Sequence, residues 1–353
     1  MAVLDFATGD ASTVKTWSKS TEREILPKTL AGKLIGSNIV VVKDELRKSA
    51  GDRVRMNLQM LLSGRGRTGN QVMEGNEEVP NFHTDDLTID QLRNASRWYG
   101  RMDKQRVVYD FRKDSRDQLS DWFADRIDTS LLNQVCGNTA QTDTAYTGLN
   151  ATVAPSTNKI IYAGSATSAA TLTSSDTFDL SLIDKAITRA KVLRDVYGEP
   201  VIRPVKIGGG DHYVMILHPY QVKALRVNTS TGQWFDIQKS AMQGGEIASN
   251  PIFSGSLGVY NGVILFENER VPLACDTTTA VALTRRAPIL GAGACWMAYG
   301  RAGGSAEKYI WNEESFDFGN EHGISASLIF GMKKAIFNSV DHATIVVDTY
   351  AAE

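Results

Sequence analysis

The chain has 353 residues, of which 42% are hydrophobic and 22% charged, so it is long enough for about two packed domains and is not a largely disordered chain. Its formal net charge of -2 excludes a protein that is drawn to nucleic acid mainly by overall charge. No run approaches the roughly 18 to 20 apolar residues that span a bilayer, and the start MAVLDFATGD leads us to expect no cleaved secretory signal.

Residues 1–50 form the first distinct segment, in which short apolar pieces alternate with polar ones and Pro27 and Gly32 interrupt any long helix. Such a segment is either an arm that becomes ordered on a neighbouring subunit or the first layer of its own domain. Residues 1–70 hold 12 Lys+Arg against 7 Asp+Glu, a charge of +5, which leaves 26 against 33, or -7, in the remainder. The basic section 1–70 and the acidic remainder are able to attract each other in contacts between copies. The alternative is that the basic section is a solvated tail.

Residues 51–110 predict a long two-stranded projection. Residues 52–58 alternate polar with apolar side chains and run into the polar stretch SGRGRTGN. Residues 71–90, in which apolar side chains are spaced among acidic ones, are predicted to form the returning side of the projection. A further strand is predicted from Gln105 to Phe111. Because an isolated two-stranded ribbon is only marginally stable in water, this projection needs a partner surface.

Arg65 and Arg67 lie among three glycines at the predicted tip of this projection. Exposed cations there add little stability to their own subunit. They are, however, able to reach carboxylates on an adjacent copy and to fix the register between subunits. We therefore take Arg65 and Arg67 as candidate inter-subunit contact residues, with an idle solvated loop as the alternative.

The clearest helix is predicted over 115–135. Ser115 with Gln118 supplies a capping-box start and Gly137 a stop. One stripe holds the apolar side chains Leu119, Trp122, Phe123, Ile127, Leu131 and Val135. A helix of this length is expected to act as a scaffold element.

The stretch 138–177 is rich in small polar residues and predicts a long surface loop, with one short hairpin near Ile160 to Tyr162. A helix over 180–197, a strand from Tyr213 to Leu217 and a helix from Pro219 to Arg226 follow it. Together with a hairpin at 256–266, this alternation predicts a mixed α/β domain.

Asn261-Gly262 separates the two halves of that hairpin and is typical of a two-residue turn with positive φ. The carboxy-terminal part is expected to be mostly β, with strands at 308–318, 324–337 and 343–347 and a turn at 319–323. We expect these strands to close the sheet that accompanies the long helix.

Two glycine-rich stretches resemble ligand-binding loops. Gly64-Arg-Gly66-Arg-Thr-Gly69 matches a dinucleotide fingerprint, but no helical pattern follows it, so a mobile hairpin tip is the better interpretation. The stretch Gly208-Gly209-Gly210-Asp211-His212 contains Asp211 and His212, whose side chains could bind a metal together with His218. A firm third ligand for such a metal site is missing. A tight turn before a buried strand explains this stretch more simply.

An acidic cluster is the remaining candidate for chemistry; it contains Glu313, Glu314, Asp317 and Glu321 beside His322. Paired carboxylates catalyse acid–base reactions in pockets, but on a strand and its turn they are more often a solvated edge. Cys136, Cys275 and Cys295 are far apart, odd in number and typical of buried reduced thiols. The sequence therefore predicts no catalytic, cofactor-binding or metal-binding residues, and no enzyme.

Two stretches resemble a known family. The run Asn250 to Pro272, NPIFSGSLGVYNGVILFENERVP, follows a helix start at His218 and Pro219 with Val222 and Leu225 behind it. Both resemble the major capsid proteins of tailed bacteriophages, and more narrowly the coat-protein family of the podoviruses that package a virion RNA polymerase. The order of the segments resembles the α+β tailed-phage major capsid fold almost from end to end.

The resemblance implies five regions: an amino-terminal arm at 1–50, an extended β-hairpin loop at 51–110, a peripheral domain with its spine helix at 111–177, an axial α/β domain at 178–300, and at 301–353 a return to the peripheral domain with C-terminal strands. It also implies hexamers and pentamers that build an icosahedral shell around double-stranded DNA, bound without sequence specificity. Further implied partners are a separate scaffolding protein, a portal and a decoration protein. The expected location is the virion, after assembly in the host bacterial cytoplasm, without a membrane.

Two alternatives stay open at this point. An encapsulin-type compartment has the same fold and differs in its contents rather than in its subunit chemistry. A cytosolic α/β enzyme would need a pocket with convergent polar groups, for which the sequence shows no motif.

Overall fold

The computed structural model describes residues 29–47, 50–60, 62, 64–98, 100–106, 111–207, 209–228, 256–301 and 308–353. Most of the predicted arm, residues 1–28, lies outside the described residues. The described chain begins with helix α2 (Leu30–Ile35). The backbone N–H groups of Leu30 and Ala31 donate to the carboxylate of Asp128, at 2.9 and 3.2 Å, and this pairing holds α2 against the long helix α4 (Phe111–Cys136).

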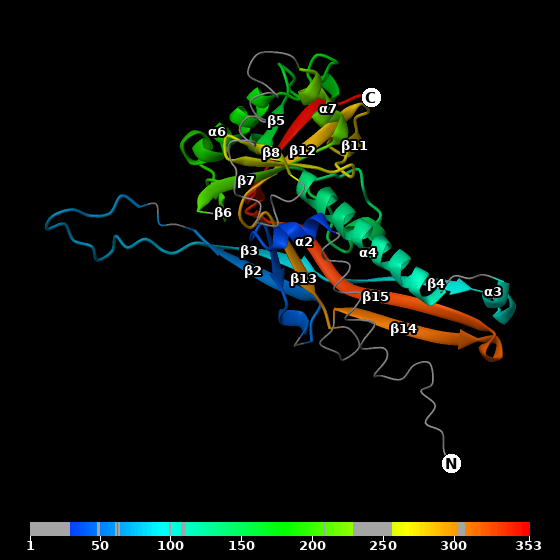
Figure 1. The fold of residues 1–353 in the computed structure, drawn as a ribbon. Coiled ribbons are helices and arrows are strands. Elements are labelled where there is room, and N and C mark those ends of the chain that lie inside the picture. The colour runs from blue at the N-terminus through cyan, green and yellow to red at the C-terminus, as the bar shows by residue number, and fades with distance from the viewer. Residues whose placement is uncertain are drawn as a thin grey trace.

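The first of the two main sheets has five strands. They are β1 (Val40–Lys43), β4 (Asp90–Trp98), β13 (Cys295–Tyr299), β14 (Tyr309–Phe316) and β15 (Glu321–Lys334). The long strand β15 pairs with β14 and then β13 on one edge and with β4 on the other. Figure 1 shows α4 lying along β15 and β4, so this sheet and the helix form one layered unit.

Helix α4 confirms the predicted apolar stripe. Leu119, Phe123, Ile127, Leu131 and Val135 are all buried, and Phe123 packs edge-on against Tyr309 of the sheet with ring centroids 5.8 Å apart. Gly137 ends the helix with φ of 62°, as expected for a C′ glycine. The predicted start was wrong, because Ser115 is buried inside the helix and α4 already begins at Phe111.

The second main sheet has seven strands in the order β5, β18, β12, β7, β9, β8, with β6 also paired to β7. They are β5 (Ile160–Tyr162), β6 (Val205–Ile207), β7 (Gly210–Leu217), β8 (Ser256–Tyr260), β9 (Val263–Glu267), β12 (Thr284–Leu290) and β18 (Thr344–Tyr350). Helices α6 (Leu180–Tyr197) and α7 (Pro219–Val227) accompany this sheet. Buried side chains of both sheets and of α4 belong to one hydrophobic cluster, so the two units are packed together.

Several local predictions are confirmed in the second unit. Helix α6 has the predicted bounds, with Asp179 as its N-cap and Gly198 in the left-handed region at its end. Helix α7 starts with Pro219 directly after its cap His218. Asn261 and Gly262 both have positive φ, 45° and 76°, and connect β8 to β9 as a two-residue turn.

Other predictions were wrong, some of them because strands pair with partners far away in the chain. Residues 101–106 form helix α3 (Arg101–Arg106) instead of the start of a strand at Gln105, and Phe111 is already helical. Strand β5 exists, but it pairs in parallel with β18 and not within a local hairpin. The C-terminal turn lies at 317–320, so Glu321 to Gly323 belong to β15. Of the C-terminal strands, β14 and β15 contact α4, whereas β18 joins the second sheet.

Short elements complete the described chain. They are α5 (Thr144–Thr147), β2 (Arg53–Gln59), β3 (Phe82–Thr88), β10 (Cys275–Asp276), β11 (Thr279–Ala280), β16 (Ile336–Phe337), β17 (Val340–Asp341) and the 3-10 turns Glu45–Arg47, Thr157–Lys159, Ala169–Thr171 and Asp317–Gly319. Cys136, Cys275 and Cys295 are buried and unpaired, which confirms the interpretation as free thiols. No helix within the described ranges is long and apolar enough to cross a membrane.

Candidate interaction surface on the projecting hairpin

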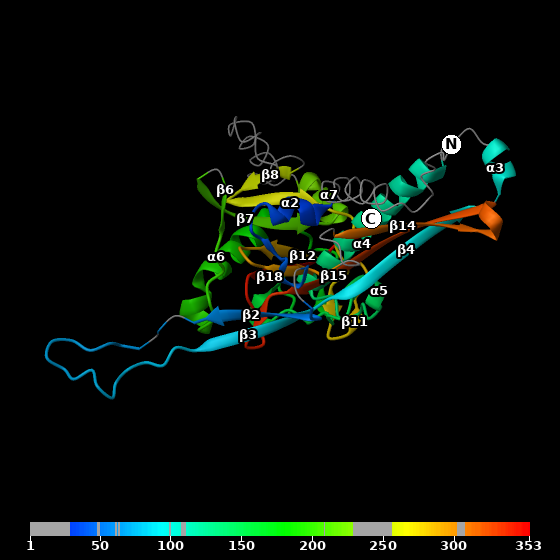
Figure 2. The same cartoon turned by 90° about the horizontal axis from the view of Figure 1, so that it is seen from below.

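Strands β2 and β3 with the connection between them, residues 53–88, form a hairpin that extends away from the rest of the molecule, as Figures 1 and 2 both show. We call this segment the projecting hairpin and residues 60–81 its loop. The two strands pair in antiparallel register from Arg53 opposite Thr88 to Gln59 opposite Phe82. Strand β4 also falls within the predicted two-stranded projection, but it pairs with β15 along its length, so that prediction was too long.

The root of the projecting hairpin is fixed to the body. Val54, Met56 and Leu87 are buried in a second hydrophobic cluster that includes Phe337. Asp85 forms an ion pair with Lys333 of β15, and its other oxygen accepts from the backbone N–H of Ile336 at 3.3 Å. These contacts set the direction in which the hairpin leaves the sheet.

The described residues of the loop are mostly exposed and hydrogen-bond to one another. Every described residue of the loop from 64 onward is exposed. The loop folds back on itself, because the N–H of Gly64 donates to Glu78 at 2.6 Å and the guanidinium of Arg67 donates to the side-chain oxygen of Asn76. Its residues therefore touch one another and solvent, and present their side chains outward.

The two candidate contact residues both lie on this loop and are exposed. Arg67 is tied to Asn76, whereas Arg65 makes no hydrogen bond or ion pair with any residue that the structure describes. The structure thus brings the two arginines to the same end of the projection and leaves at least one guanidinium available to another molecule.

Exposed apolar side chains lie in the same region and were not predicted from the sequence. Of the fourteen exposed large hydrophobic residues in the described part of the chain, five belong to the loop or to the first residue of β3, namely Leu62, Val72, Met73, Val79 and Phe82. Val79 is 84% exposed and Val72 is 69% exposed. Apolar side chains gathered on one projecting segment indicate a surface that another molecule covers. In the sequence, valines lie among acidic residues at 71–82, but this pattern was interpreted as one side of a strand and not as an exposed apolar surface.

The glycine-rich candidates have structural roles in the described chain. Gly64, Gly66 and Gly69 lie in the loop, and no helix follows them within residues 64–81. Gly208 lies outside the described residues, and Asp211 and His212 belong to β7. His218 caps α7 by accepting from the N–H of Tyr220 at 3.2 Å, and burial lowers its pKa to about 4. Among the described residues, no three His, Cys, Asp or Glu side chains gather as a metal site.

The acidic cluster is held in a framework of polar contacts. Glu313 forms an ion pair with Arg112 of α4 at 2.7 Å and accepts from the indole N–H of Trp311 at 2.7 Å. Glu321 forms an ion pair with Arg97 of β4, and Ser315 lies 3.1 Å from a ring nitrogen of His322. These contacts link β14 and β15 to α4 and β4, so the cluster stabilises the far end of the first sheet.

Comparisons with known proteins decide the family. The model of a family described as phage capsid protein matches residues 5–353. The chain belongs to the phage capsid protein family. A curated relative, the major capsid protein of Pseudomonas phage KPP25, is 27% identical over 338 residues, which cover 86% of this chain and 83% of that protein.

Solved structures agree with the family. The capsid of Ralstonia phage GP4 superposes with a TM-score of 0.76 and 31% identity, covering 90% of this chain and 91% of that one. The capsid of cyanophage Pam1 has a TM-score of 0.65 at 18% identity, with 88% of each chain covered, and shows the fold alone.

This phage capsid protein therefore has the α+β fold of tailed-phage major capsid proteins, which confirms the fold predicted from the sequence. It is a major capsid protein of a phage and a component of the virion, and its copies assemble into a capsid shell. The comparisons favour this role over an encapsulin-type compartment and over an α/β enzyme. Family and fold point to a structural role.

Proposed function

We propose that copies of this chain form hexamers and pentamers that close into an icosahedral shell around the double-stranded DNA of a tailed phage. The observation that carries the proposal is the projecting hairpin, which has a fixed root and a loop rich in exposed apolar side chains. Such a surface is stabilised when a neighbouring copy covers it. In this proposal the loop binds a different part of the neighbouring copy, so the contact is head-to-tail. Head-to-tail contacts form closed rings when the rotation between copies closes.

Arg65 and Arg67 take part in this contact in our proposal. Their charges lie at the exposed end of the hairpin and are available to carboxylates on the next subunit. Each contact is weak by itself, but many of them per shell give a stable particle through multivalency. The chain carries no catalytic role in this proposal.

The predicted division into regions is part of the same proposal: an arm at 1–50, an extended loop at 51–110, a peripheral domain at 111–177 and 301–353, and an axial domain at 178–300. Within it, only residues 53–88 form the projecting hairpin, and β5 and β18 pair in the second sheet. The proposed partners beyond further copies are a separate scaffolding protein, a portal and a decoration protein, with assembly in the host bacterial cytoplasm. The narrower likeness to podoviruses that package a virion RNA polymerase stays a prediction.

The test is to produce the chain alone and together with candidate scaffolding proteins encoded near it, and to analyse the products by size-exclusion chromatography and electron microscopy. We expect rings and closed shells at micromolar protein concentration. A compact monomer that persists under all of these conditions would overturn the proposal.

A further inference from the structure

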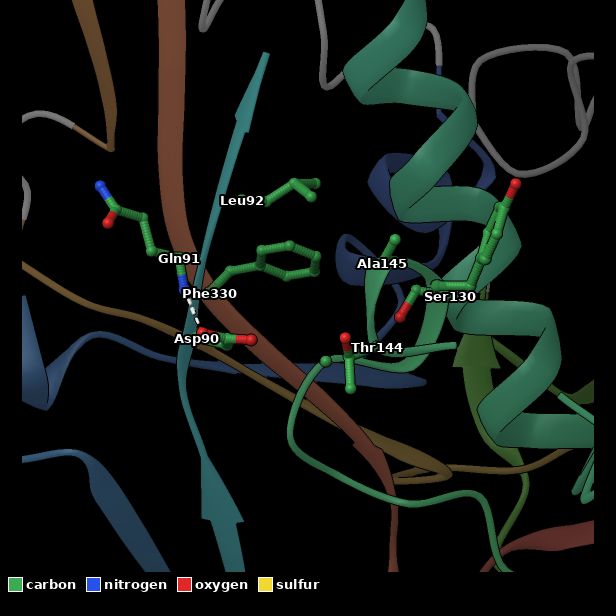
Figure 3. A pocket seen from close by; sticks show the side chains of 9 residues that line it. Asp90, Gln91, Leu92, Ser130, Thr144, Ala145 and Phe330 are labelled. Atoms are coloured by element: carbon green, nitrogen blue, oxygen red, sulfur yellow. Dashed lines mark hydrogen bonds between the residues drawn. The ribbon is translucent and has the colours of Figure 1, made fainter. Parts of the chain in front are cut away.

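A cavity of about 160 Å³ lies between α4, α5, β4 and β15. Its walls are formed by Asp90, Gln91, Leu92, Ser130, Thr144, Ala145, Tyr146, Gly148 and Phe330. We call it the α4–β4 cavity. Figure 3 shows that the carboxylate of Asp90 and the hydroxyls of Ser130 and Thr144 are directed toward its centre, with Leu92 and Phe330 beside them.

The acceptors of this cavity suit a cation. One oxygen of Asp90 accepts from the N–H of Gln91 at 2.7 Å, and its second oxygen makes no hydrogen bond or ion pair within the described part of the chain. Ser130 is a buried residue of α4, yet its hydroxyl has no partner among the described residues. A half-buried carboxylate with hydroxyl acceptors nearby favours a ligand with several N–H donors.

The apolar walls narrow the choice of cation. Tyr146 already stacks against Arg126 at 4.1 Å, so Phe330 is the aromatic ring left for a ligand, together with Leu92. A guanidinium is flat, weakly hydrated and able to stack on an aromatic ring while it donates to a carboxylate. An ammonium is compact and strongly hydrated, and fits such a site less well.

We propose that the α4–β4 cavity receives the guanidinium of Arg65 from the loop of a second copy of this chain. Arg65 is exposed, is flanked by Gly64 and Gly66, and has no partner within the described residues, so its charge complements Asp90. The same subunit cannot supply it, because the loop points away from the cavity in both views of the molecule. This inference rests on the proposed function, since it names the site at which the neighbouring copy binds.

Covalent trapping tests the placement. In the variant Arg65→Cys with Ala145→Cys, each subunit carries one thiol on the loop and one on the cavity wall, while the three native cysteines stay buried. Assembled particles treated with a mild oxidant should give a ladder of cross-linked chains on a non-reducing gel. The control, Arg65→Cys with Val227→Cys, places the second thiol at an exposed position at the end of α7 and should give no ladder.

A double-substitution cycle tests the charge pair. Asp90→Asn keeps an acceptor for the N–H of Gln91 and removes the charge, and Arg65→Gln removes the guanidinium. Each single change should raise the protein concentration needed for half-maximal assembly about tenfold, and the double change should also raise it about tenfold, because both remove the same contact. Asp195→Asn, at an exposed position on α6, is the matched control and should have no effect.

The outcomes separate this inference from the proposed function. If the wild-type chain forms no rings or shells, the proposed function fails. If wild-type particles form, two results overturn only this inference: particles of the variant Arg65→Cys with Ala145→Cys give no ladder, or the two single effects of the charge pair multiply to about a hundredfold in the double variant. Either result would show that the cavity does not receive Arg65. Circular dichroism of each free subunit checks that the variants fold.

Discussion

In the second sheet two opposite charges are buried, whereas on the loop of the projecting hairpin apolar side chains are exposed. The guanidinium of Arg286 on β12 donates to both oxygens of Asp348 on β18, at 2.8 and 2.7 Å, and both side chains are at most 2% exposed. Val79 on the loop is 84% exposed. The second sheet therefore pairs these two buried charges within one subunit. The loop leaves its apolar contacts to be completed by another molecule.

The first way to break this comparison is to break the buried pair. We predict that Asp348→Ala costs about 3–5 kcal/mol in the free energy of unfolding, because it leaves the charge of Arg286 buried without its partner. Chemical denaturation of the free subunit measures this. Asp86→Ala, which removes an exposed ion pair with Arg55, is the control and should change stability little. Equal losses in the two variants would show that Arg286 and Asp348 are not buried as described.

The second prediction concerns the scaffold helix. Leu131 is fully buried in α4, so Leu131→Ala should lower the free energy of unfolding by about 2–5 kcal/mol through lost contacts and a cavity. Val227→Ala at an exposed position of α7 should change it by less than about 0.5 kcal/mol. A Leu131→Ala subunit as stable as wild type would mean that the apolar stripe of α4 does not face the core.

The third prediction concerns the free energy of unfolding at acidic pH. Burial lowers the pKa of His342 to about 4 and that of His218 to about 4, below the usual 6.5, so both imidazoles bind a proton less readily in the folded chain than in the unfolded chain. Their contribution to stability is therefore complete above about pH 6.5 and is lost as the pH falls toward 4. His342→Gln should flatten the decline of unfolding free energy between these pH values, measured by denaturation at each pH. An unchanged slope would contradict the buried, neutral state of His342.

The fourth prediction concerns the apolar loop. Val72→Ser with Val79→Ser should leave the melting temperature of the free subunit nearly unchanged, because both side chains are exposed in one subunit, and should reduce the yield of shells. Val227→Ser serves as a control with a similarly exposed valine outside the loop. Normal shell yield in the double variant would show that no neighbouring copy covers these side chains.

The smallest effect on the subunit is expected from the two arginines. Arg65→Glu with Arg67→Glu should leave circular dichroism and melting temperature nearly unchanged while impairing shell formation, most strongly at low salt. Light scattering at several salt concentrations follows the assembly. If the variant assembles like wild type at each of them, the loop makes no contact based on charge.

The sequence predicted those elements whose signals are local. Helix α6 has a capping Asp179 and a terminal Gly198, and the turn at Asn261 and Gly262 needs no distant partner. The stripe on α4 was predicted for the same reason. The start of α4 was missed because Ser115 is typical of a cap, although here it is buried within the helix.

Elements that depend on distant partners were not predictable in the same way. Strand β4 is defined by its register with β15, in which Leu92 lies opposite Leu328, and nothing near residue 92 indicates that pairing. The α4–β4 cavity likewise combines side chains that are far apart in the sequence, such as Asp90 and Phe330. No short stretch of the sequence therefore indicates it. Arg65 and Arg67 were found because glycines and charges mark a tip, but the exposed valines on the same loop were interpreted as strand residues.

Hydrogen–deuterium exchange of the free subunit and of assembled shells tests the central claim most directly. We predict that amides of the loop, residues 60–81, exchange rapidly in the free subunit and slow markedly in shells, while those of β7 and β18 are protected in both states. Equal, rapid exchange of the loop before and after assembly would contradict the claim that a neighbouring copy covers it.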